Sequence, residues 1–249
     1  SAIWMTDQKT VRDFQLDAFV RFFANHGLFA LLFRPPWRTV ANGSRTYVAR
    51  LMEDFAGAVR RDDPVQSIVR QSDGVHVRTV KGSHDVISDV VVATHADEAL
   101  ALIGDQSERE RNVLGAFRYS QIRAVVHSDA SAMPQRRAVW SSWNFVADGK
   151  AASGDGQSVT YWMNRLQPLP TTMPVFVTLN PHRPIDPQKY HMEIDYSHPA
   201  FNAAALRAQR DLWDLQGQGG VWYCGAYFGS GFHEDGLQAG LAVAEAIGG

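Results

Sequence analysis

Residues 229–247, "GSGFHEDGLQAGLAVAEAI", place a glycine-rich turn directly before a run of small and apolar residues with helical spacing. Residues 221–228 just before them, "VWYCGAYF", are apolar and aromatic, which predicts a buried strand. The two stretches therefore predict a strand–turn–helix unit. Small side chains let such a helix pack closely on a sheet, and the N–H groups of its first turn favour negative charge.

This unit departs from the dinucleotide-binding fingerprint G-x-G-x-x-G. Gly229 and Gly231 fit its first two glycines, but Glu234 stands where the third should be. The pattern by itself leaves two interpretations open: a helix that faces a cofactor, or an ordinary closing helix of an α/β sheet.

Composition narrows the class of protein. The chain has 249 residues, of which 45% are hydrophobic, enough for one large core or two. The net charge is −2 and the basic residues are scattered, so we expect no nucleic-acid partner. No apolar run approaches the ~18 residues of a membrane span, so we expect no transmembrane segment. The only cysteine, Cys224, predicts a buried structural thiol in a reducing, cytoplasmic compartment.

The chain shows two kinds of local pattern. Residues 44–55 predict a helix with a buried apolar stripe, and residues 90–102 predict a fully buried strand followed by a helix. Residues 122–179 instead read as long strands, among them "SVTYWMNRLQ" at 158–167, rich in β-branched and aromatic residues. We therefore expect an α/β part and a separate antiparallel part, α+β overall.

Three stretches, in order, resemble the flavin-containing amine oxidase and phytoene desaturase superfamily. They are "DDPVQSIV" at 62–69, "SDVVVATHADEAL" at 88–100 and the strand–turn–helix unit. Further runs over nearly the whole chain are similar to a bacterial subgroup of predicted NAD/FAD-binding proteins; they are "WRTVANGSRTYV", "VTYWMNRLQ", "FVTLNP" and "GFHEDGL".

The resemblance implies a split FAD-binding domain with a mixed sheet, at 38–102 and 218–249, and an antiparallel-sheet substrate domain, at 1–37 and 103–217. The superfamily's N-terminal β-α-β unit with G-x-G-x-x-G has no counterpart in this sequence. We therefore expect a fragment that is inactive alone and whose partner is the missing N-terminal part of the same protein.

The resemblance also implies an FAD site. The backbone of Val65 would meet the adenine, Thr94 and His95 would lie at a turn near the cofactor, and the helix start would face the flavin. Many relatives have an acid directly after the last strand's glycine, but here Ala226 follows Gly225; Glu234 or Asp235 could take that place, or either could cap the helix. The full cofactor set is Val65, Thr94, His95, Gly225, Ala226, Gly231, Glu234, Asp235, Gly236 and Leu237.

For the reaction, the resemblance implies hydride transfer from a C–H or C–N bond of a small or lipid-like substrate to flavin N5. Amine oxidases commonly place a lysine near N5, but no predicted strand of 122–179 carries one, so we expect a lysine-free reaction. His233 beside the turn is a candidate proton-transfer residue. The alternative is a non-catalytic module that binds a nucleotide or a partner and keeps only the fold.

Two further sets of residues are candidates for sites. The residues expected to line the substrate pocket are Trp143, Asn144, Trp162 and Asn164, with core packing as an open alternative for the two tryptophans. His191, Glu193 and Asp195 alternate along "YHMEIDYSH", which spaces them ~6–7 Å apart on one strand face. Because metal ligands must converge, we interpret this face as polar surface and expect no metal site.

Overall fold

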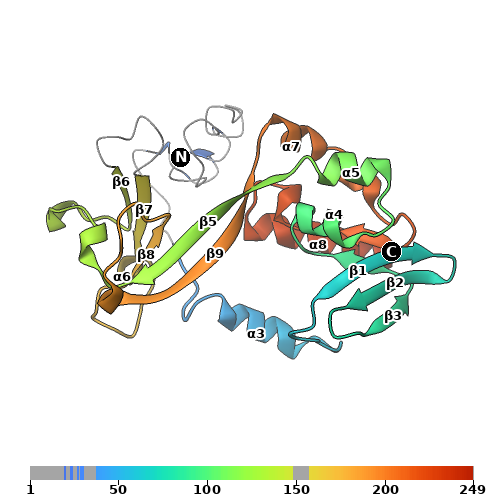
Figure 1. The fold of residues 1–249 in the computed structure, drawn as a ribbon, viewed down its shortest axis with the longest axis horizontal. Coiled ribbons are helices and arrows are strands. Elements are labelled where there is room, and N and C mark those ends of the chain that lie inside the picture. Colours follow the sequence, from blue (N-terminus) through green and yellow to red (C-terminus); the bar gives the residue numbers. More distant parts are fainter. Residues whose placement is uncertain are drawn as a thin grey trace. The chain divides into compact units, whose positions relative to one another are not determined.

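The computed structural model describes residues 20, 23, 24, 27, 29, 30, 38–147 and 157–248. Their contacts divide them into two compact units (Figure 1). The parallel-pair unit comprises Ala58–Tyr119 and Pro199–Gly249, and the five-stranded unit comprises Ser120–His198 with the described residues up to Gly57. No helix among the described residues is both long and apolar enough to cross a membrane.

The parallel-pair unit contains an antiparallel sheet of three strands, β1 (Val65–Gln71), β2 (Gly74–Thr79) and β3 (His84–Ile87), in the order β1-β2-β3. The Asp73–Gly74 turn joins the first two strands, and Gly74 has φ 140°, a backbone conformation that favours glycine. Val75 on β2 is 1% exposed, so one face of the hairpin contributes to the core.

A second, parallel sheet gives the unit its name. It pairs β4 (Val90–Val92) with β10 (Val221–Tyr223), and residue 90 lies opposite residue 221. Each strand leads into a helix after a short turn, as the strand–turn–helix sequence predicts. The strand expected over residues 221–228 is shorter than predicted: it ends at Tyr223, and residues 226–228 form a 3-10 helix after Gly225. The helical segments of the unit are α4 (Ala96–Leu102), α5 (Glu108–Leu114), α7 (Ala203–Ala208), η5 (Leu212–Leu215), η6 (Ala226–Phe228) and α8 (His233–Gly248).

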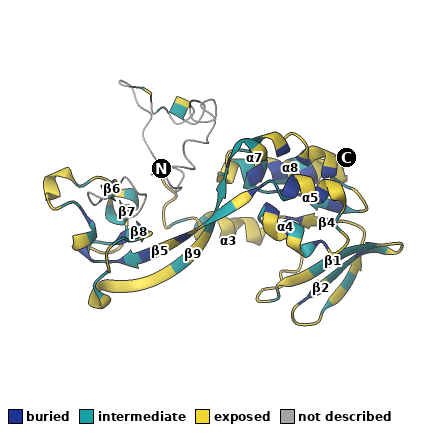
Figure 2. Ribbon diagram, turned by 45° about the horizontal axis from the view of Figure 1, so that its top comes forward, coloured by how far each residue is buried: buried dark blue, intermediate teal, exposed yellow. Residues whose placement is uncertain are grey.

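The core of this unit joins both segments of the chain. Leu114, Leu212 and Val221 are each 0% exposed and belong to one cluster of buried side chains. Figure 2 shows buried stretches, in dark blue, within α4, α5, α7 and α8. Cys224 is 8% exposed and packs with Ala239 and Val243 of α8, which confirms the predicted buried thiol; burial raises its pKa.

The five-stranded unit is built on one sheet with the strand order β6-β7-β8-β5-β9. The strands are β5 (Arg118–His127), β6 (Trp143–Ala147), β7 (Gln157–Trp162), β8 (Phe176–Leu179) and β9 (Tyr190–Ala200). The division between the two units falls within β5 and within β9. The helical segments of the same unit are α3 (Arg45–Glu53), α6 (Met163–Leu166), η1 (Ala130–Ala132), η2 (Arg137–Val139) and η4 (Pro187–Lys189).

Two local expectations need correction here. The strand expected over 158–167 ends at Trp162, and α6 follows, because the Asn164 side chain bonds to the loop that leads into β8. Helix α3 forms as predicted, but its expected stripe is not buried: Leu51 is 68% and Val48 48% exposed. Helical spacing predicts which residues share a face, but it does not supply a surface that covers them.

The predicted fold class is confirmed: helices combine with several sheets in a mixed α+β fold. The boundaries of the compact units differ from those of the expected domains. Residues 103–119 and 199–217 pack in the parallel-pair unit, because Leu114 and Leu212 share its core, and residues 38–57 group with the five-stranded unit. Residues 1–19 of the expected substrate domain lie outside the described residues. The assignment of FAD and substrate roles to the two parts stays a prediction.

Candidate functional site

The site that the structure supports best lies where β4 and β10 end. The strands run parallel to the pair Val92–Tyr223, and the Cys224 N–H then donates to the Val92 carbonyl oxygen at 3.2 Å. Both strands leave the sheet at the same edge, so the turn with Thr94 lies beside the turn with Gly225. Ligands of open α/β sheets bind outside the carboxyl ends of parallel strands.

The approach of these two turns requires glycine at position 225. Gly225 has φ 154°, and a Cβ atom there would lie 2.7 Å from the Tyr227 ring and 3.4 Å from the Thr94 carbonyl oxygen. A side chain at this position would therefore disturb the ring and press on the neighbouring turn. The two turns that carry predicted cofactor residues meet backbone against backbone.

Helix α8 begins beside this edge, at His233. The Asp235 carboxylate accepts the Phe232 N–H at 2.9 Å, as the third residue of a capping box does. This confirms the capping alternative for Asp235. The same carboxylate occupies the space that a side chain at Gly229 would need.

Hydrogen bonding within α8 limits which N–H groups can face a ligand. The Gly236 N–H donates to the Phe232 carbonyl oxygen at 3.2 Å, so the helical hydrogen bonds already begin at this residue. Glu234 and Asp235 precede it, in the part of the first turn where no helical carbonyl is in reach. A cofactor at this helix start would therefore be met by the N–H groups of Glu234 and Asp235 before those of Gly236 and Leu237.

Two buried polar atoms near this edge have no hydrogen-bond partner among the described residues: His95 Nδ1 and the Tyr227 hydroxyl. The His95 ring stacks on Tyr119, with 4.5 Å between ring centroids and 17° between ring planes. Tyr227 is 3% exposed, and burial raises its pKa, so its hydroxyl keeps its proton. Buried polar groups normally find a partner, so these two atoms fit a site completed by another molecule.

A cluster that sequence analysis missed holds β10 in place. The Glu110 carboxylate accepts the Tyr223 hydroxyl and the Ser107 N–H and pairs with the Arg70 guanidinium. Burial alone would raise the pKa of Glu110, but the bonds from Tyr223 and Ser107 outweigh it and lower that pKa. The capping-box spacing of Ser107 and Glu110 was the available signal; their partners on β1 and β10 are distant in sequence.

The remaining predicted cofactor residues occupy different positions. Val65 begins β1, in the three-stranded sheet rather than the parallel pair, and is 37% exposed. Ala226 opens η6, and its backbone N lies 3.6 Å from the position of a Cβ atom on Gly236, so η6 and the first turn of α8 touch. Gly231 has φ 91°, within the loop before α8. His233 is the first, exposed residue of that helix.

The expected substrate-pocket residues all lie in the five-stranded unit but do not share one surface. Trp143 and Asn144 are neighbours on β6, so their side chains point to opposite faces of the sheet. The strand register places Asn144 opposite Thr160, on the same face as Trp162. Trp143 is 45% exposed, with its ring against Tyr161, whereas Trp162 packs against Trp140.

The side chains of both asparagines form hydrogen bonds with backbone groups and do not line an open surface. The Asn144 side chain is bonded to both backbone groups of Ser141 and donates to the Thr160 carbonyl oxygen. The Asn164 amide donates to the Met173 carbonyl oxygen and accepts the Val175 N–H. These contacts give both residues a local structural task, and a role toward substrate stays a prediction.

The polar face of β9 carries separate pairs. His191 Nε2 lies 2.6 Å from Ser128 Oγ, and Glu193 pairs with Arg123 at 2.7 Å. Within residues 38–147 and 157–248, no three histidine, cysteine, aspartate or glutamate side chains form a group that could hold a metal ion.

Comparison with known proteins places the fold among a group of enzymes. No family model and no curated protein matches the sequence. A fatty acid isomerase from P. acnes matches with a TM-score of 0.58 and 12% identity, over 82% of this chain and 52% of its own. A protein named as a protoporphyrinogen oxidase from Exiguobacterium sp. 255-15 matches with a TM-score of 0.59 and 16% identity, over 93% of this chain and 58% of its own.

A putrescine oxidase matches with a TM-score of 0.55 and 12% identity, over 83% of this chain and 52% of its own. The chain thus spans little more than half the length of these structures. Over that part it shares the fold of these three proteins, which supports the resemblance drawn from sequence at the level of fold alone.

Proposed function

We propose that this chain is part of an FAD-dependent oxidoreductase, and that the edge where β4 and β10 end meets the flavin. The observation that carries the proposal is the approach of Gly225 to Thr94 at the carboxyl ends of two parallel strands, beside the start of α8. Many folds of this class host several functions, so the residues at this edge must be tested directly.

The residues of this edge fit a flavin by their donor and acceptor groups. The first turn of α8 favours a group that gains negative charge, as the pyrimidine side of a reduced flavin does. His95 Nδ1 and the Tyr227 hydroxyl are buried polar atoms that a bound molecule could satisfy. Flavin, when bound, supplies the redox chemistry by accepting a hydride at N5.

The pyrophosphate of FAD needs a second binding element. No G-x-G-x-x-G pattern occurs in the sequence, and the structural neighbours are longer than this chain. We propose that an upstream segment of the same protein with that pattern completes the site. The chain described here would then supply the flavin-facing edge and the substrate-facing sheet.

We propose a small or lipid-like substrate that loses hydride from a C–H or C–N bond. The names of two neighbours, a fatty acid isomerase and a putrescine oxidase, span these two kinds of substrate. Of the four lysines, Lys81 and Lys189 are placed by the structure, and neither belongs to the β4/β10 edge. His233 remains the candidate for moving a proton at this edge.

The first experiment is a visible absorbance spectrum of the chain mixed with FAD, after removal of free cofactor. The longer protein with its upstream segment is measured in parallel. Flavin absorbance that stays with the longer protein supports the proposal. Colourless protein in both cases contradicts it.

A matched pair of glycine substitutions then locates the site. Gly225→Ala should raise the dissociation constant for FAD about tenfold or more, because the added Cβ strains the backbone and meets the neighbouring turn. Gly240→Ala is the control, because a Cβ atom there meets nothing within 4 Å. Equal FAD affinity in both variants, with both folded by circular dichroism, would place the flavin elsewhere.

A second candidate function is a non-catalytic module that binds a nucleotide or a partner. The observation in its favour is Ala226, which stands directly after the strand's glycine where many relatives of the superfamily have an acid. Bound FAD that neither amines nor fatty acids reduce under anaerobic conditions would favour this function. Bleaching of the flavin by either class would favour the enzyme.

A further inference from the structure

One face of the five-stranded sheet carries an aromatic group that the proposed function does not use. Trp162 at the end of β7 lies opposite Phe176 at the start of β8, so both side chains are on the same face. Trp140 packs edge-on against both, with 5.4 Å and 5.7 Å between ring centroids. Phe176 is 0% exposed, so it anchors the two partly buried tryptophan rings to the core of this unit.

Two arginines lie over these rings. The Arg137 guanidinium carbon is 5.2 Å from the centroid of the Trp140 ring, and that of Arg165 is 5.8 Å from the centroid of the Trp162 ring. Cation–π attraction favours such a position of a guanidinium on an aromatic face. With two further residues of the η2 turn they form the arginine–tryptophan cluster, which comprises Arg136, Arg137, Val139, Trp140, Trp162 and Arg165.

The cluster carries positive charge that no carboxylate balances. The sequence has no aspartate or glutamate in residues 130–147 or in residues 157–185. In the part of the chain that the structure describes, no ion pair involves Arg136, Arg137 or Arg165. All three side chains belong to exposed residues, so their charge faces solvent.

The carboxylates next along the chain have other partners or positions. Asp129 lies 3.7 Å and Asp186 3.2 Å from Lys189 Nζ. Asp148 and Asp155 come before β7 in the sequence, whereas the cluster takes the last residue of that strand. The charge of the three arginines is therefore available to a partner of opposite charge.

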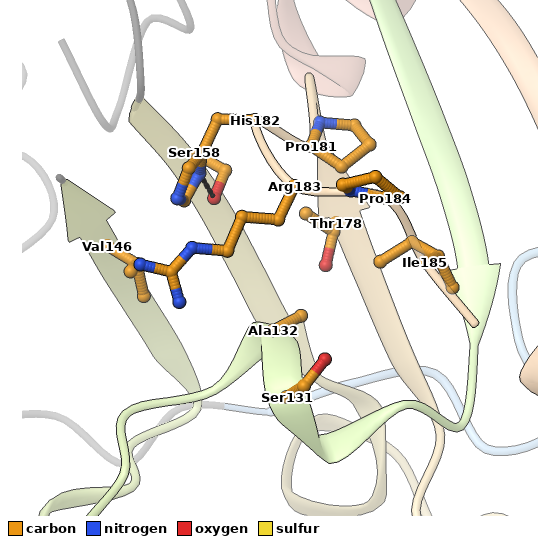
Figure 3. A pocket seen from close by; sticks show the side chains of 10 residues that line it. All are labelled: Ser131, Ala132, Val146, Ser158, Thr178, Pro181, His182, Arg183, Pro184 and Ile185. Carbon is orange, nitrogen blue, oxygen red and sulfur yellow. Dashed lines mark hydrogen bonds between the residues drawn. The ribbon is translucent and has the colours of Figure 1, made fainter.

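The same face of the sheet continues beyond the cluster into a pocket. Ser158 and Thr178 follow the strand pleat onto the face of Trp162 and Phe176. Figure 3 shows these two side chains in the pocket, and no aspartate or glutamate is among the residues that line it. An anionic surface over this face would meet no repelling carboxylate there.

Exposed apolar side chains accompany the arginines. Val139 is 59% and Met173 48% exposed. The Met173 carbonyl oxygen accepts the Asn164 amide at 3.0 Å, which holds its loop close to Arg165. Single exposed apolar residues are common on protein surfaces, but here they occur together with aromatic rings and unbalanced cations.

We propose that the arginine–tryptophan cluster docks on the surface of a membrane that contains anionic lipids. Guanidinium groups form charge-assisted bonds to lipid phosphates, and each arginine close to an anionic bilayer favours binding about fivefold. Tryptophan rings prefer the lipid–water interface, where Val139 and Met173 insert between head groups. Nucleic acid fits less well, because guanidinium groups already cover the rings on which bases would stack.

The test measures co-sedimentation of the 249-residue chain with vesicles. One set contains equal amounts of phosphatidylglycerol and phosphatidylcholine, and the other contains phosphatidylcholine alone. We expect binding to the anionic vesicles only, and weaker binding as salt is raised. FAD is absent throughout, so the result does not depend on the proposed flavin site.

Two variants then locate the surface. The double variant Arg136→Gln, Arg137→Gln should weaken binding to the anionic vesicles about tenfold or more. Val139→Ser keeps the charge but removes the exposed apolar group, and should weaken binding about fivefold. The matched control is Arg61→Gln, Arg78→Gln, which removes the same charge from exposed positions of the parallel-pair unit. This control should bind within about twofold of wild type.

Three results would overturn the proposal. The first is equal binding to neutral vesicles, and the second is an equal loss in the control and in the Arg136, Arg137 variant. The third is full displacement from anionic vesicles by poly-glutamate or single-stranded DNA at the same concentration of charge, which would identify a soluble polyanion as the partner. Circular dichroism verifies that each variant is folded.

Discussion

At the scale of single residues, two buried polar clusters decide local geometry in the two units. In the parallel-pair unit, Glu110 is 3% exposed, forms an ion pair with Arg70 and accepts a hydrogen bond from the Tyr223 hydroxyl. In the five-stranded unit, His127 on β5 and Thr178 on β8 are 0% and 1% exposed, and His127 Nε2 lies 2.7 Å from Thr178 Oγ1. Buried polar groups stabilise a fold only while every member has a partner, so single substitutions here have large effects.

Glu110→Ala should lower the free energy of unfolding by about 3 kcal/mol, because it leaves the Arg70 guanidinium without its buried partner. Glu108→Ala, an exposed position of the same helical turn, should change it by less than about 0.5 kcal/mol. Urea unfolding at neutral pH measures both. Equal effects would mean that the carboxylate of Glu110 contributes nothing specific.

The His127 chain of hydrogen bonds has a fixed direction. His127 Nδ1 accepts the Asp129 N–H, so the ring proton is on Nε2 and is donated to the Thr178 hydroxyl. The hydroxyl of Thr178 then donates to Thr160, and that of Thr160 to the Ala132 carbonyl oxygen. Thr178→Val should therefore lower the free energy of unfolding by about 2 kcal/mol, against little change for the exposed Thr172→Val.

The same histidine predicts a pH dependence. Burial lowers the pKa of His127, so the unfolded chain takes up a proton at a higher pH than the folded chain does. Its contribution to stability is complete above the ordinary histidine pKa of about 6.5 and is lost as pH falls through the lower, folded value. Urea unfolding between neutral and mildly acidic pH should show this loss in wild type, and His127→Gln should flatten the curve in that range.

At the scale of elements, β4, β10 and α8 form the candidate site by meeting at one edge. The capping bond of Asp235 fixes where α8 begins, and Gly236 packs that first turn against η6. The N–H groups that face a ligand are therefore set by where the helix starts. A change at the cap should alter the helix start without touching the sheet.

Asp235→Ala should destabilise the protein by about 1 kcal/mol, because the Phe232 N–H loses its acceptor. Asp235→Asn keeps an acceptor oxygen and should restore most of that stability. Thermal unfolding of the two variants beside Glu234→Ala gives the comparison. A loss in Asp235→Asn as large as in Asp235→Ala would assign the effect to charge at the helix start rather than to the cap.

At the scale of the whole molecule, the chain folds as two compact units, and the proposed flavin edge belongs to only one of them. A ligand stabilises the part that it binds, by about 2.7 kcal/mol at a hundredfold excess over its dissociation constant. FAD binding should therefore stabilise the parallel-pair unit and leave the stability of the five-stranded unit unchanged.

Hydrogen exchange of the longer protein with its upstream segment, with and without FAD, tests this expectation. Protection should rise in residues 94–98 and 225–238 of the parallel-pair unit, around the turns that meet at Gly225. Strands β6 to β8 of the other unit serve as the internal control and should exchange at unchanged rates. Protection that rises in those strands alone would contradict the proposed place of the flavin.

The sequence by itself determined the local units. Strand β10, its glycine turn, α8 and the buried thiol of Cys224 follow from patterns within residues 221–248. These features depend on periodicity and turn chemistry between near neighbours. The mixed α+β class also follows, because the two kinds of pattern occupy different parts of the chain.

Only the tertiary structure decided what those units touch. Residues far apart in sequence pair when β4 meets β10 and when Arg70 meets Glu110, and no local pattern specifies either contact. The register of β6 on β7 placed Trp143 and Trp162 on opposite faces, and side-chain bonds of Asn164 ended the strand expected beyond Trp162. The exposed stripe of α3 has the same cause: periodicity defines a face, but long-range packing decides whether anything covers it.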